Sequence, residues 1–471
     1  MKKNKTLITI VVVALLVAAL VVGLLIFRAS KKESVSDSLS LGNHYLTSLD
    51  YNGAIEQYNR VLAIDPYNQA ALQGIAVSYA GNGNIEMSRQ IMTDDMVQAT
   101  EPEILRVYAD ILEDAEEYLD AARILEVVVD ARDTDEDYAN YQEVLLKALT
   151  RVFDRQYPYA ESNNVSIDLN QGTVRTRGTN VLGALGTGAN LGEYADTEAF
   201  SSADFPGAAE SVFTTGTQSV VIDENGHLWS AGSNRSGQKA NRTATLVPEE
   251  GWTEDTELGT VVKAAGTGSS VFALTAEGDL YVAGQNNGYV FGSSWLNTWT
   301  PVAAFGKVMD VQYDGANGIY VLAVSGRLYR AEVNQSSGTT YVSTTNWRSV
   351  DKDIVAFSSS GQALVAIDRD GQVRGGDGYE VEYPETWQTY DEQGQWTGNR
   401  PAFKAVQTAA LEDGAYFLDD EGKVHFVKDG TASELALSQE AVSLYTSGSS
   451  CVVQMADGSY QLYDSDGKEK A

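Results

Sequence analysis

The residues of this sequence whose types could support chemistry are three histidines, one cysteine and a few glycine-rich or acidic segments. His44, His227 and His425 have no nucleophile motif beside them. Cys451 is the single cysteine, so an intrachain disulfide or a Cys/His zinc spacing cannot form. These residues favour packed or solvated side chains over catalytic ones.

Two Asp-x-Asp-Gly segments and one Gly-x-Gly segment resemble parts of ligand-binding loops. Residues 368–371 and 464–467 lack the further acidic ligands and the final Glu of a calcium-binding EF-hand loop. The segment GTGANLG, 186–192, is not followed by the amphipathic helix that a dinucleotide-binding loop requires. We interpret all three as turns and loops, and we expect no catalytic residue, no metal, no cofactor and no enzymatic activity.

Tryptophan side chains are the remaining candidates, because they can stack on sugar rings. Trp387 and Trp396 lie in the long insertion GDGYEVEYPETWQTYDEQGQWTGNRP, 376–401. Long insertions often carry binding residues. We predict these two as candidate ligand contacts, with core packing or a mobile loop as the alternative for each.

Length and charge limit the classes of protein that the chain can represent. Its 471 residues indicate two or three folded units, and 43% hydrophobic residues can supply a large core. The 33 basic and 65 acidic residues give a net charge of -32. A field of that sign repels phosphate backbones, so we expect no nucleic-acid partner.

The N-terminus predicts a membrane anchor. Residues 1–6 form a short basic tail, and residues 7–27 carry no charge over a length that spans a bilayer core of about 30 Å. The linker 28–34 offers a poor signal-peptide cleavage site. We therefore expect a single-pass protein of the cell membrane. Three Lys/Arg residues lie on each side of the span, and we favour an extracytoplasmic location for the bulk of the chain.

Residues 35–155 show paired helical patterns. In 41–68, apolar positions at helical spacing are interrupted at Asp50–Gly53 and end at Asp65-Pro66. The segment resembles the tetratricopeptide repeat at Leu41, Gly42, Tyr45, Ala54, Tyr58 and Pro66, and weaker copies start at Gln69 and about Pro102. Residues 136–153 are expected to form a capping helix over the last repeat.

The resemblance implies a concave groove that holds a peptide or another protein. The periodicity of the repeat then predicts a groove lined by Leu39, Asn43, Gln73, Val77, Arg106 and Asp110. The alternative is that the repeats are a structural spacer, because a repeat array needs a stacked core whatever it binds.

Residues 160–471 contain a repeated hairpin. An apolar strand, a glycine tip and a second strand recur at spacings of 36 to 54 residues, with the tips at Gly172, Gly226, Gly278, Gly326, Gly371, Gly422 and Gly458. This pattern is typical of a β-propeller, here with seven blades. Only 13 residues follow Gly458, which leaves room for a last blade that borrows a strand from residues 157–162.

The first three hairpins run into related loops, at Gly178-Thr179-Asn180, Gly232-Ser233-Asn234 and Gly284-Gln285-Asn286. These loops and hairpins resemble the repeat of the regulator of chromosome condensation family, over about two-thirds of the chain. The resemblance implies a seven-bladed scaffold that binds a partner on one face. We do not extend nucleotide exchange on a chromatin-bound GTPase to this chain, because its acidic charge and predicted anchor argue against chromatin.

The predicted architecture is multi-domain: an N-terminal transmembrane helix, all-α tetratricopeptide-like repeats and an all-β seven-bladed propeller. We expect a membrane-anchored, non-enzymatic scaffold or adaptor that binds proteins of unknown identity through the helical groove and the propeller face. One alternative is a cell-wall or carbohydrate-binding propeller with a glycan as partner. A second is a propeller enzyme of unknown reaction.

Overall fold

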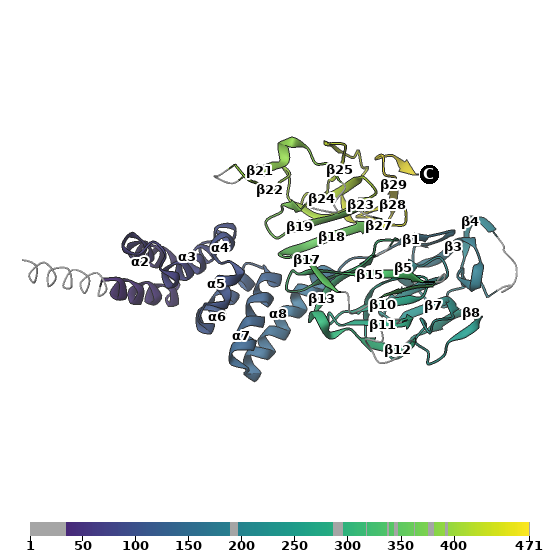
Figure 1. The fold of residues 1–471 in the computed structure, drawn as a ribbon, viewed down its shortest axis with the longest axis horizontal. Coiled ribbons are helices and arrows are strands. Elements are labelled where there is room, and N and C mark those ends of the chain that lie inside the picture. The colour runs from purple at the N-terminus through teal and green to yellow at the C-terminus, as the bar shows by residue number, and fades with distance from the viewer. Residues whose placement is uncertain are drawn as a thin grey trace, which may run out of the picture. The chain divides into compact units, whose positions relative to one another are not determined.

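A computed structural model describes residues 34–188, 196–285, 295–316, 318–336, 339–342, 347–361, 363–374, 381–390 and 394–470. The chain divides into two compact units, with the boundary between Ala148 and Leu149. Figure 1 shows the helices in purple to blue and the strands in teal to yellow, so the all-α segment precedes the all-β segment. Each unit is described by itself below.

The predicted localisation at a membrane requires a correction. Within the described residues, no helix has both the length and the apolar character needed to cross a bilayer. This finding conflicts with a single-pass membrane protein. The predicted span itself, residues 7–27, lies outside the described residues.

The expected helical N-terminal region is confirmed. Its first helix covers residues 34–47. The further helices are α2 (Tyr51–Ile64), α3 (Gln69–Gly81), α4 (Ile85–Ile91), α5 (Asp94–Gln98), α6 (Pro102–Asp114), α7 (Tyr118–Arg132) and α8 (Asp135–Phe153). Side-chain oxygens of Asp50, Asn68 and Asn84 accept the free amides at the starts of α2, α3 and α4. The predicted capping helix, 136–153, corresponds to α8.

Small residues allow the helices to approach one another closely. A Cβ atom on Gly42 or Gly74 would lie 2.7 Å or 2.2 Å from the ring of Tyr58, which is fully buried. Ser88 is also fully buried and donates a hydrogen bond to the hydroxyl of Tyr108 at 3.0 Å. The helix that contains Ser88 ends early, and the chain continues as the short helix α5.

Across the described residues of the second unit, the strands form seven antiparallel sheets, which we call blades 1 to 7 in chain order. Blades 1 to 4 consist of β1 (Tyr159–Ser162), β2 (Val165–Asn170), β3 (Thr173–Thr179), β4 (Asp196–Ser202); β5 (Ala209–Thr214), β6 (Gln218–Asp223), β7 (Leu228–Asn234), β8 (Thr245–Glu254); β9 (Val261–Gly266), β10 (Ser270–Thr275), β11 (Leu280–Gln285), β12 (Trp295–Pro301); and β13 (Val308–Tyr313), β14 (Gly318–Ala323), β15 (Leu328–Ser336), β16 (Thr339–Val342), β17 (Arg348–Asp351).

Blades 5 to 7 consist of β18 (Ile354–Ser360), β19 (Ala363–Asp368), β20 (Val373–Arg374), β21 (Gln388–Tyr390), β22 (Trp396–Asn399); β23 (Ala405–Leu411), β24 (Gly414–Asp419), β25 (Val424–Lys428), β26 (Thr431–Glu434); and β27 (Ala441–Ser447), β28 (Ser450–Met455), β29 (Tyr460–Tyr463), β30 (Glu469–Lys470). Strands pair with their chain neighbours, except that β17 joins β15 and β22 lies between β20 and β21. The seven-bladed propeller is thereby confirmed.

The glycine tips have the conformation that the sequence predicts. All seven tip glycines, from Gly172 to Gly458, have φ between +74° and +83°, a region that side chains disfavour. In several blades an Asp three residues earlier closes the turn. The Oδ1 atom of Asp368, for example, accepts the amides of Asp370 and Gln372 at 3.0 Å and 2.8 Å. The Asp-x-Asp-Gly segments are therefore turns, as expected.

A second set of glycines, at the end of the third strand in blades 1 to 3, allows close backbone contact. Gly178, Gly232 and Gly284 have φ of +107°, +101° and +111°. A Cβ atom on Gly178 would lie 1.7 Å from the carbonyl oxygen of Asn164. These are the first glycines of the three loops that resemble the regulator of chromosome condensation repeat, so the resemblance has a steric basis in this chain.

The hydrophobic core of the propeller lies between blades. Five clusters of buried residues each join two neighbouring blades, and the largest joins blades 3 and 4 around Phe272, Leu274, Val311 and Ile319. Each blade therefore depends on its neighbour for burial of its apolar face.

The ring closes without a shared strand. Blade 7 contains four strands from its own segment, so it does not borrow a strand from residues 157–162, which contribute β1 to blade 1. Side chains bridge the two blades instead. The carboxylate of Glu161 accepts from Ser449 and Ser450 and lies 3.5 Å from the Nζ atom of Lys470.

Candidate functional site: the central channel of the propeller

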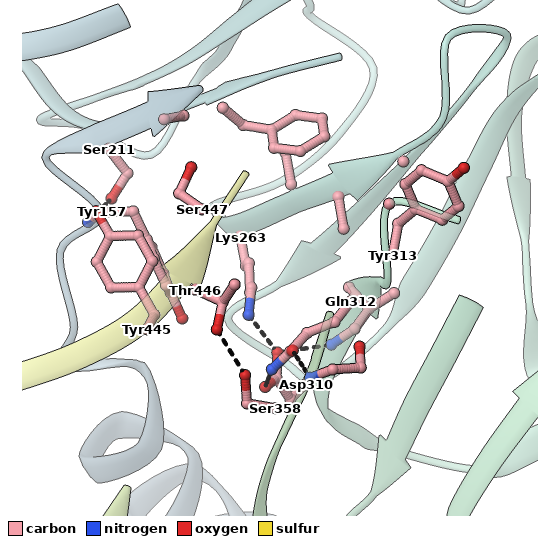
Figure 2. Close-up of a pocket in the computed structure, with 18 of the residues that line it drawn as sticks. Tyr157, Ser211, Lys263, Asp310, Gln312, Tyr313, Ser358, Tyr445, Thr446 and Ser447 are labelled. Atoms are coloured by element: carbon pink, nitrogen blue, oxygen red, sulfur yellow. Dashed lines mark hydrogen bonds and ion pairs between the residues drawn. The ribbon is translucent and has the colours of Figure 1, made fainter. Parts of the chain in front are cut away.

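A cavity of about 460 Å³ lies in the centre of the propeller. The first strand of each of the seven blades contributes to its wall, as does the segment 152–157 that precedes β1. Figure 2 shows side chains from different blades that point into this space. The volume falls in the range of about 300–1,000 Å³ that is usual for small-molecule sites.

The strand register places seven equivalent residues around the cavity. In each blade, we take the residue of the second strand that lies four positions before the tip glycine. Its pairing partner on the first strand is the equivalent residue of that blade. These equivalent residues are Tyr159, Ser211, Lys263, Asp310, Ala356, Gln407 and Ser443. Six of the seven are polar, and in blades 2 to 7 a register shift lies directly beside the position. Such bulges redirect side chains, here at the channel wall.

The residue after each of these positions is apolar in every blade except blade 6. Val212, Val311 and Phe357 are examples, and all three are buried. These residues line the same cavity as the polar ones, so polar and apolar side chains alternate along its wall. Thr408 of blade 6 is the exception and carries a hydroxyl at the apolar position.

A buried ion pair crosses from blade 3 to blade 4. The Nζ atom of Lys263 lies 2.5 Å from Oδ1 of Asp310 and 4.9 Å from the ring centre of Tyr157. Burial lowers the pKa of Lys263, but the Asp310 carboxylate outweighs it and the pKa is raised, so the ammonium stays charged. Asp310 also accepts from the Nε2 atom of Gln312 at 2.9 Å.

Hydroxyl groups cover another part of the wall. The Oγ atom of Ser358 and Oγ1 of Thr446 are 2.9 Å apart (Figure 2). Ser358 also accepts the amide of Ala410, and Thr446 donates to the carbonyl oxygen of Ala410. Ser359 and Thr408 line the same cavity and are each 4% exposed. Within the part of the chain that the structure describes, their hydroxyl oxygens have no hydrogen-bond partner.

The predicted groove residues of the helical unit divide between surface and interior. Val77 is fully buried and Gln73 is 6% exposed, with its Nε2 atom donating to the carbonyl oxygen of Ala99 at 3.3 Å. Neither residue offers surface to a partner. Leu39 is half-buried, while Asn43 and Asp110 are exposed. Arg106 pairs with the exposed Glu136 at 3.0 Å.

The two predicted tryptophan contacts are not alike. Trp387 is 6% exposed and packs within the core of blades 5 and 6, edge-on to Phe403 and Phe417. Trp396 is 47% exposed on β22, opposite the exposed Tyr390 of β21. The pair therefore does not form one binding surface, and packing explains Trp387.

The histidines and the cysteine do not assemble into a site. His227 and His425 lie in different blades and face Asp223 and Asp419 of their own hairpins, while His44 belongs to the helical unit. The imidazole of His425 stacks on the ring of Phe403, with the ring centres 3.7 Å apart. Cys451 is fully buried, and burial raises the pKa of its thiol well above the ordinary value. Among the described residues, no group of three or more His, Cys, Asp or Glu side chains could hold a metal ion.

The channel residues were not among the sequence-based candidates. The signal that could have found them is alignment of the seven hairpins on their tip glycines, which places a polar residue at the same point of almost every first strand.

Comparisons with known proteins found similarity to solved structures only, at low sequence identity. No protein-family model matches the chain, and no curated protein sequence is similar to it. Similar solved structures include Prp20p from Saccharomyces cerevisiae, with 15% identity over 65% of this chain and 82% of that one and a TM-score of 0.47. Human WBSCR16 has 16% identity over 62% and 70% of the two chains, with a TM-score of 0.38. BamB from Moraxella catarrhalis has 12% identity over 64% and 81%, with a TM-score of 0.33.

Proposed function

We propose that the chain is a non-enzymatic scaffold that binds a protein partner through its helical unit and presents the propeller as a second binding surface. The observation that carries the proposal is the distribution of exposed apolar side chains. Among the described residues, six of the nine large hydrophobic side chains that are exposed belong to the smaller, helical unit: Leu41, Leu49, Tyr67, Met87, Tyr138 and Leu146. Burial of such side chains against a partner would contribute favourably to association.

The packing of the helices supports a tetratricopeptide-like array. Gly42 and Gly74 face Tyr58, and the small Ala54 and Ala121 are fully buried. Gly42, Ala54 and Ala121 stand at positions where the repeat needs small side chains for close helix contact. In such an array Asn43, Arg106 and Asp110 supply the polar contacts of the groove. Arg106 also lies 3.4 Å from the buried Asp137, which holds the guanidinium in place, while the exposed Glu136 can be exchanged for a carboxylate of the partner at little cost.

Site-specific photo-crosslinking of the full chain in its own cells tests this proposal. A benzophenone amino acid replaces Asn43 in one variant and the exposed Thr431 of β26 in another. We expect a discrete adduct with one protein at position 43 and not at position 431. Asp110→Arg should reduce the adduct at least about fivefold, because a coupling of ~1 kcal/mol or more is lost.

The matched control is Glu101→Arg, which makes the same charge change at an exposed residue just before α6. Equal adducts at positions 43 and 431, or equal effects of the two charge reversals, would contradict a groove interface.

A further inference from the structure

The segment that leads into the first blade places a cation at the wall of the central channel. Exposure alternates along residues 154–157, which have no regular secondary structure. Asp154 and Gln156 are exposed and do not line the cavity, whereas Arg155 and Tyr157 are half-buried and do. Because alternate residues of an extended chain point the same way, Arg155 and Tyr157 face the channel together.

The guanidinium of Arg155 is not neutralised within the protein. Among the described residues, no hydrogen bond or ion pair joins it to a carboxylate. Asp310, on the same wall, is already bonded through both oxygens. Its Oδ1 atom accepts from Lys263 at 2.5 Å and from the amide of Val311 at 2.7 Å, and its Oδ2 atom accepts from Gln312 at 2.9 Å.

The other carboxylates of the wall are held further along the first strands. Glu161, near the end of β1, lies 3.5 Å from the Nζ atom of Lys470. Asp314, which follows β13, accepts the amides of Ala316 and Gly318 at 2.8 Å and 2.9 Å. Arg155 precedes β1, so these carboxylates lie towards the opposite end of the channel.

Arg155 also repels a second cation of the wall. Burial lowers the pKa of Lys263, Asp310 raises it above the ordinary value, and the charge of Arg155 opposes that rise. Because Lys263 and Asp310 neutralise each other, one positive charge is left at this end of the channel, in a chain whose net charge is -32. Two like charges held close together cost free energy, and an anion in the cavity would offset that cost.

Tyr157 adds a hydrogen-bond donor beside this charge. Its ring meets Tyr445 edge to face with ring centres 5.0 Å apart, and the Nζ atom of Lys263 lies 4.9 Å from its ring centre (Figure 2). Its hydroxyl has no hydrogen-bond partner among the described residues and does not belong to their buried polar atoms. A phenol and a guanidinium that face the same space can both donate to one carboxylate.

Apolar side chains line the same end of the channel. Val152 and Phe153 are the last residues of α8, and Val262 and Val355 belong to the first strands of blades 3 and 5. All four are half-buried, so each keeps surface that a ligand can reach. An apolar wall beside a few polar groups is the usual composition of a small-molecule site.

We propose that this end of the channel binds a small organic monocarboxylate with an apolar body. The carboxylate accepts from the guanidinium of Arg155 and the phenol of Tyr157, and the hydrocarbon part lies against the four apolar side chains. One negative charge matches the one positive charge that is left over, whereas Asp310 would repel a dianion such as phosphate more strongly. The site goes beyond the protein binding proposed for the helical unit and does not depend on it.

Isothermal titration calorimetry on the full chain tests the proposal with four probes: isovalerate, phenylacetate, phenylacetamide and inorganic phosphate. We expect at least one of the two carboxylates to bind with one-to-one stoichiometry. Phenylacetamide and phosphate should bind at least about tenfold more weakly than that carboxylate, because the amide lacks the charge and phosphate carries too much of it.

Substitutions at the two proposed donors should weaken carboxylate binding to different extents. Arg155→Met should weaken it about tenfold or more, because a charge-assisted pair is lost. Tyr157→Phe keeps the ring contacts and removes one hydrogen bond, so it should weaken binding about threefold or more.

Arg177→Met is the matched control for the loss of charge. Arg177 is a half-buried arginine of β3 that lies outside the cavity wall, with its guanidinium 4.6 Å from the ring centre of Phe200. The substitution makes the same change in net charge as Arg155→Met, and it should leave carboxylate binding unchanged.

The melting temperature of the ligand-free variants separates a binding role from a structural one. Because Arg155 repels Lys263 and has no acidic partner among the described residues, Arg155→Met should leave the melting temperature unchanged or raise it. The bound carboxylate should raise the melting temperature of the wild type and have no such effect on this variant.

Five outcomes overturn the proposal. These are no binding of either carboxylate, equally tight binding of phenylacetamide or phosphate, binding that Arg155→Met or Tyr157→Phe does not weaken, equal weakening by Arg177→Met, and a lower melting temperature of the ligand-free Arg155→Met variant. The last result would show that Arg155 stabilises the fold itself.

Discussion

The phenol of Tyr445 and the backbone of Tyr159 are joined by two hydrogen bonds. The Oη atom of Tyr445 donates to the carbonyl oxygen of Tyr159 at 2.9 Å and accepts its amide at 3.1 Å. Tyr445 belongs to the last blade and Tyr159 to the first. One side chain thus makes part of the contact that a shared strand would make in a ring closed by strand exchange.

Tyr445→Phe should weaken this junction. The substitution leaves the amide and the carbonyl of Tyr159 without their partner, so we expect the free energy of unfolding to fall by about 1–3 kcal/mol. Urea unfolding followed by tryptophan fluorescence measures the change. Tyr390→Phe is the control, because Tyr390 is 57% exposed, and its effect should stay within about 0.5 kcal/mol. Equal midpoints for both variants would show that the junction does not depend on Tyr445.

The same junction should be sensitive to acid through Glu161. Burial raises the pKa of Glu161, but hydrogen bonds from Tyr159 and Ser450 and the charge of Lys470 outweigh it, and the pKa is lowered from 4.5. A lowered folded-state pKa means that the stabilisation is complete above the unfolded value and is lost as the pH falls through the folded value.

Glu161→Gln should therefore destabilise the chain at neutral pH. The difference from the wild type should shrink as the pH falls from neutral to about 3, measured by urea unfolding at several pH values. Glu434→Gln, at an exposed residue of β26, should show no such convergence. A difference that is constant over this pH range would refute the assigned role of the Glu161 carboxylate.

Two glycines with positive φ should respond differently to alanine. At Gly178 a Cβ atom would collide with a carbonyl oxygen, in addition to the strain of φ +107°. At Gly458, with φ +83°, no atom lies within 4 Å of the added Cβ. We expect a loss of about 3 kcal/mol or more for Gly178→Ala and about 1–2 kcal/mol for Gly458→Ala, by chemical denaturation. Similar losses of stability for the two variants would mean that the close contact between Gly178 and the carbonyl oxygen of Asn164 does not affect the stability of the fold.

Alanine substitutions of the two tryptophans in the blade 5 insertion should lower the stability of the fold by different amounts. Trp387→Ala removes a ring from the core of blades 5 and 6 and should cost about 3–5 kcal/mol. Trp396→Ala removes a half-exposed ring and should cost less than about 1 kcal/mol. Thermal unfolding compares the two. A larger loss for Trp396→Ala would contradict the packing of this insertion.

Much of the propeller could be predicted from the sequence because its signals are local. A hairpin tip that needs positive φ requires glycine, and the strand on each side shows its own apolar pattern, as around Gly226 and Gly278. The helix α8 was predictable for the same reason, since its apolar periodicity covers its whole length. These features do not depend on which distant segment packs beside them.

The site residues could not be predicted because they depend on contacts between distant segments. The burial of Gln73 follows from the early end of α4, which brings the carbonyl of Ala99 to its amide. Trp387 is buried because Phe403 and Phe417, from blade 6, pack against it. The Lys263–Asp310 pair joins residues that are 47 positions apart and requires the register of two blades.

The closure of the ring by side chains bears on how such a chain can change over evolutionary time. Among the described residues, every blade is built from one uninterrupted segment, and no sheet combines strands from the two ends of the propeller. A gene duplication or deletion that encompasses one whole blade would leave every other sheet intact. Only the contacts between the blades that become neighbours after the change would have to form anew. The propeller can therefore be circularly permuted at any boundary between blades without dividing a sheet.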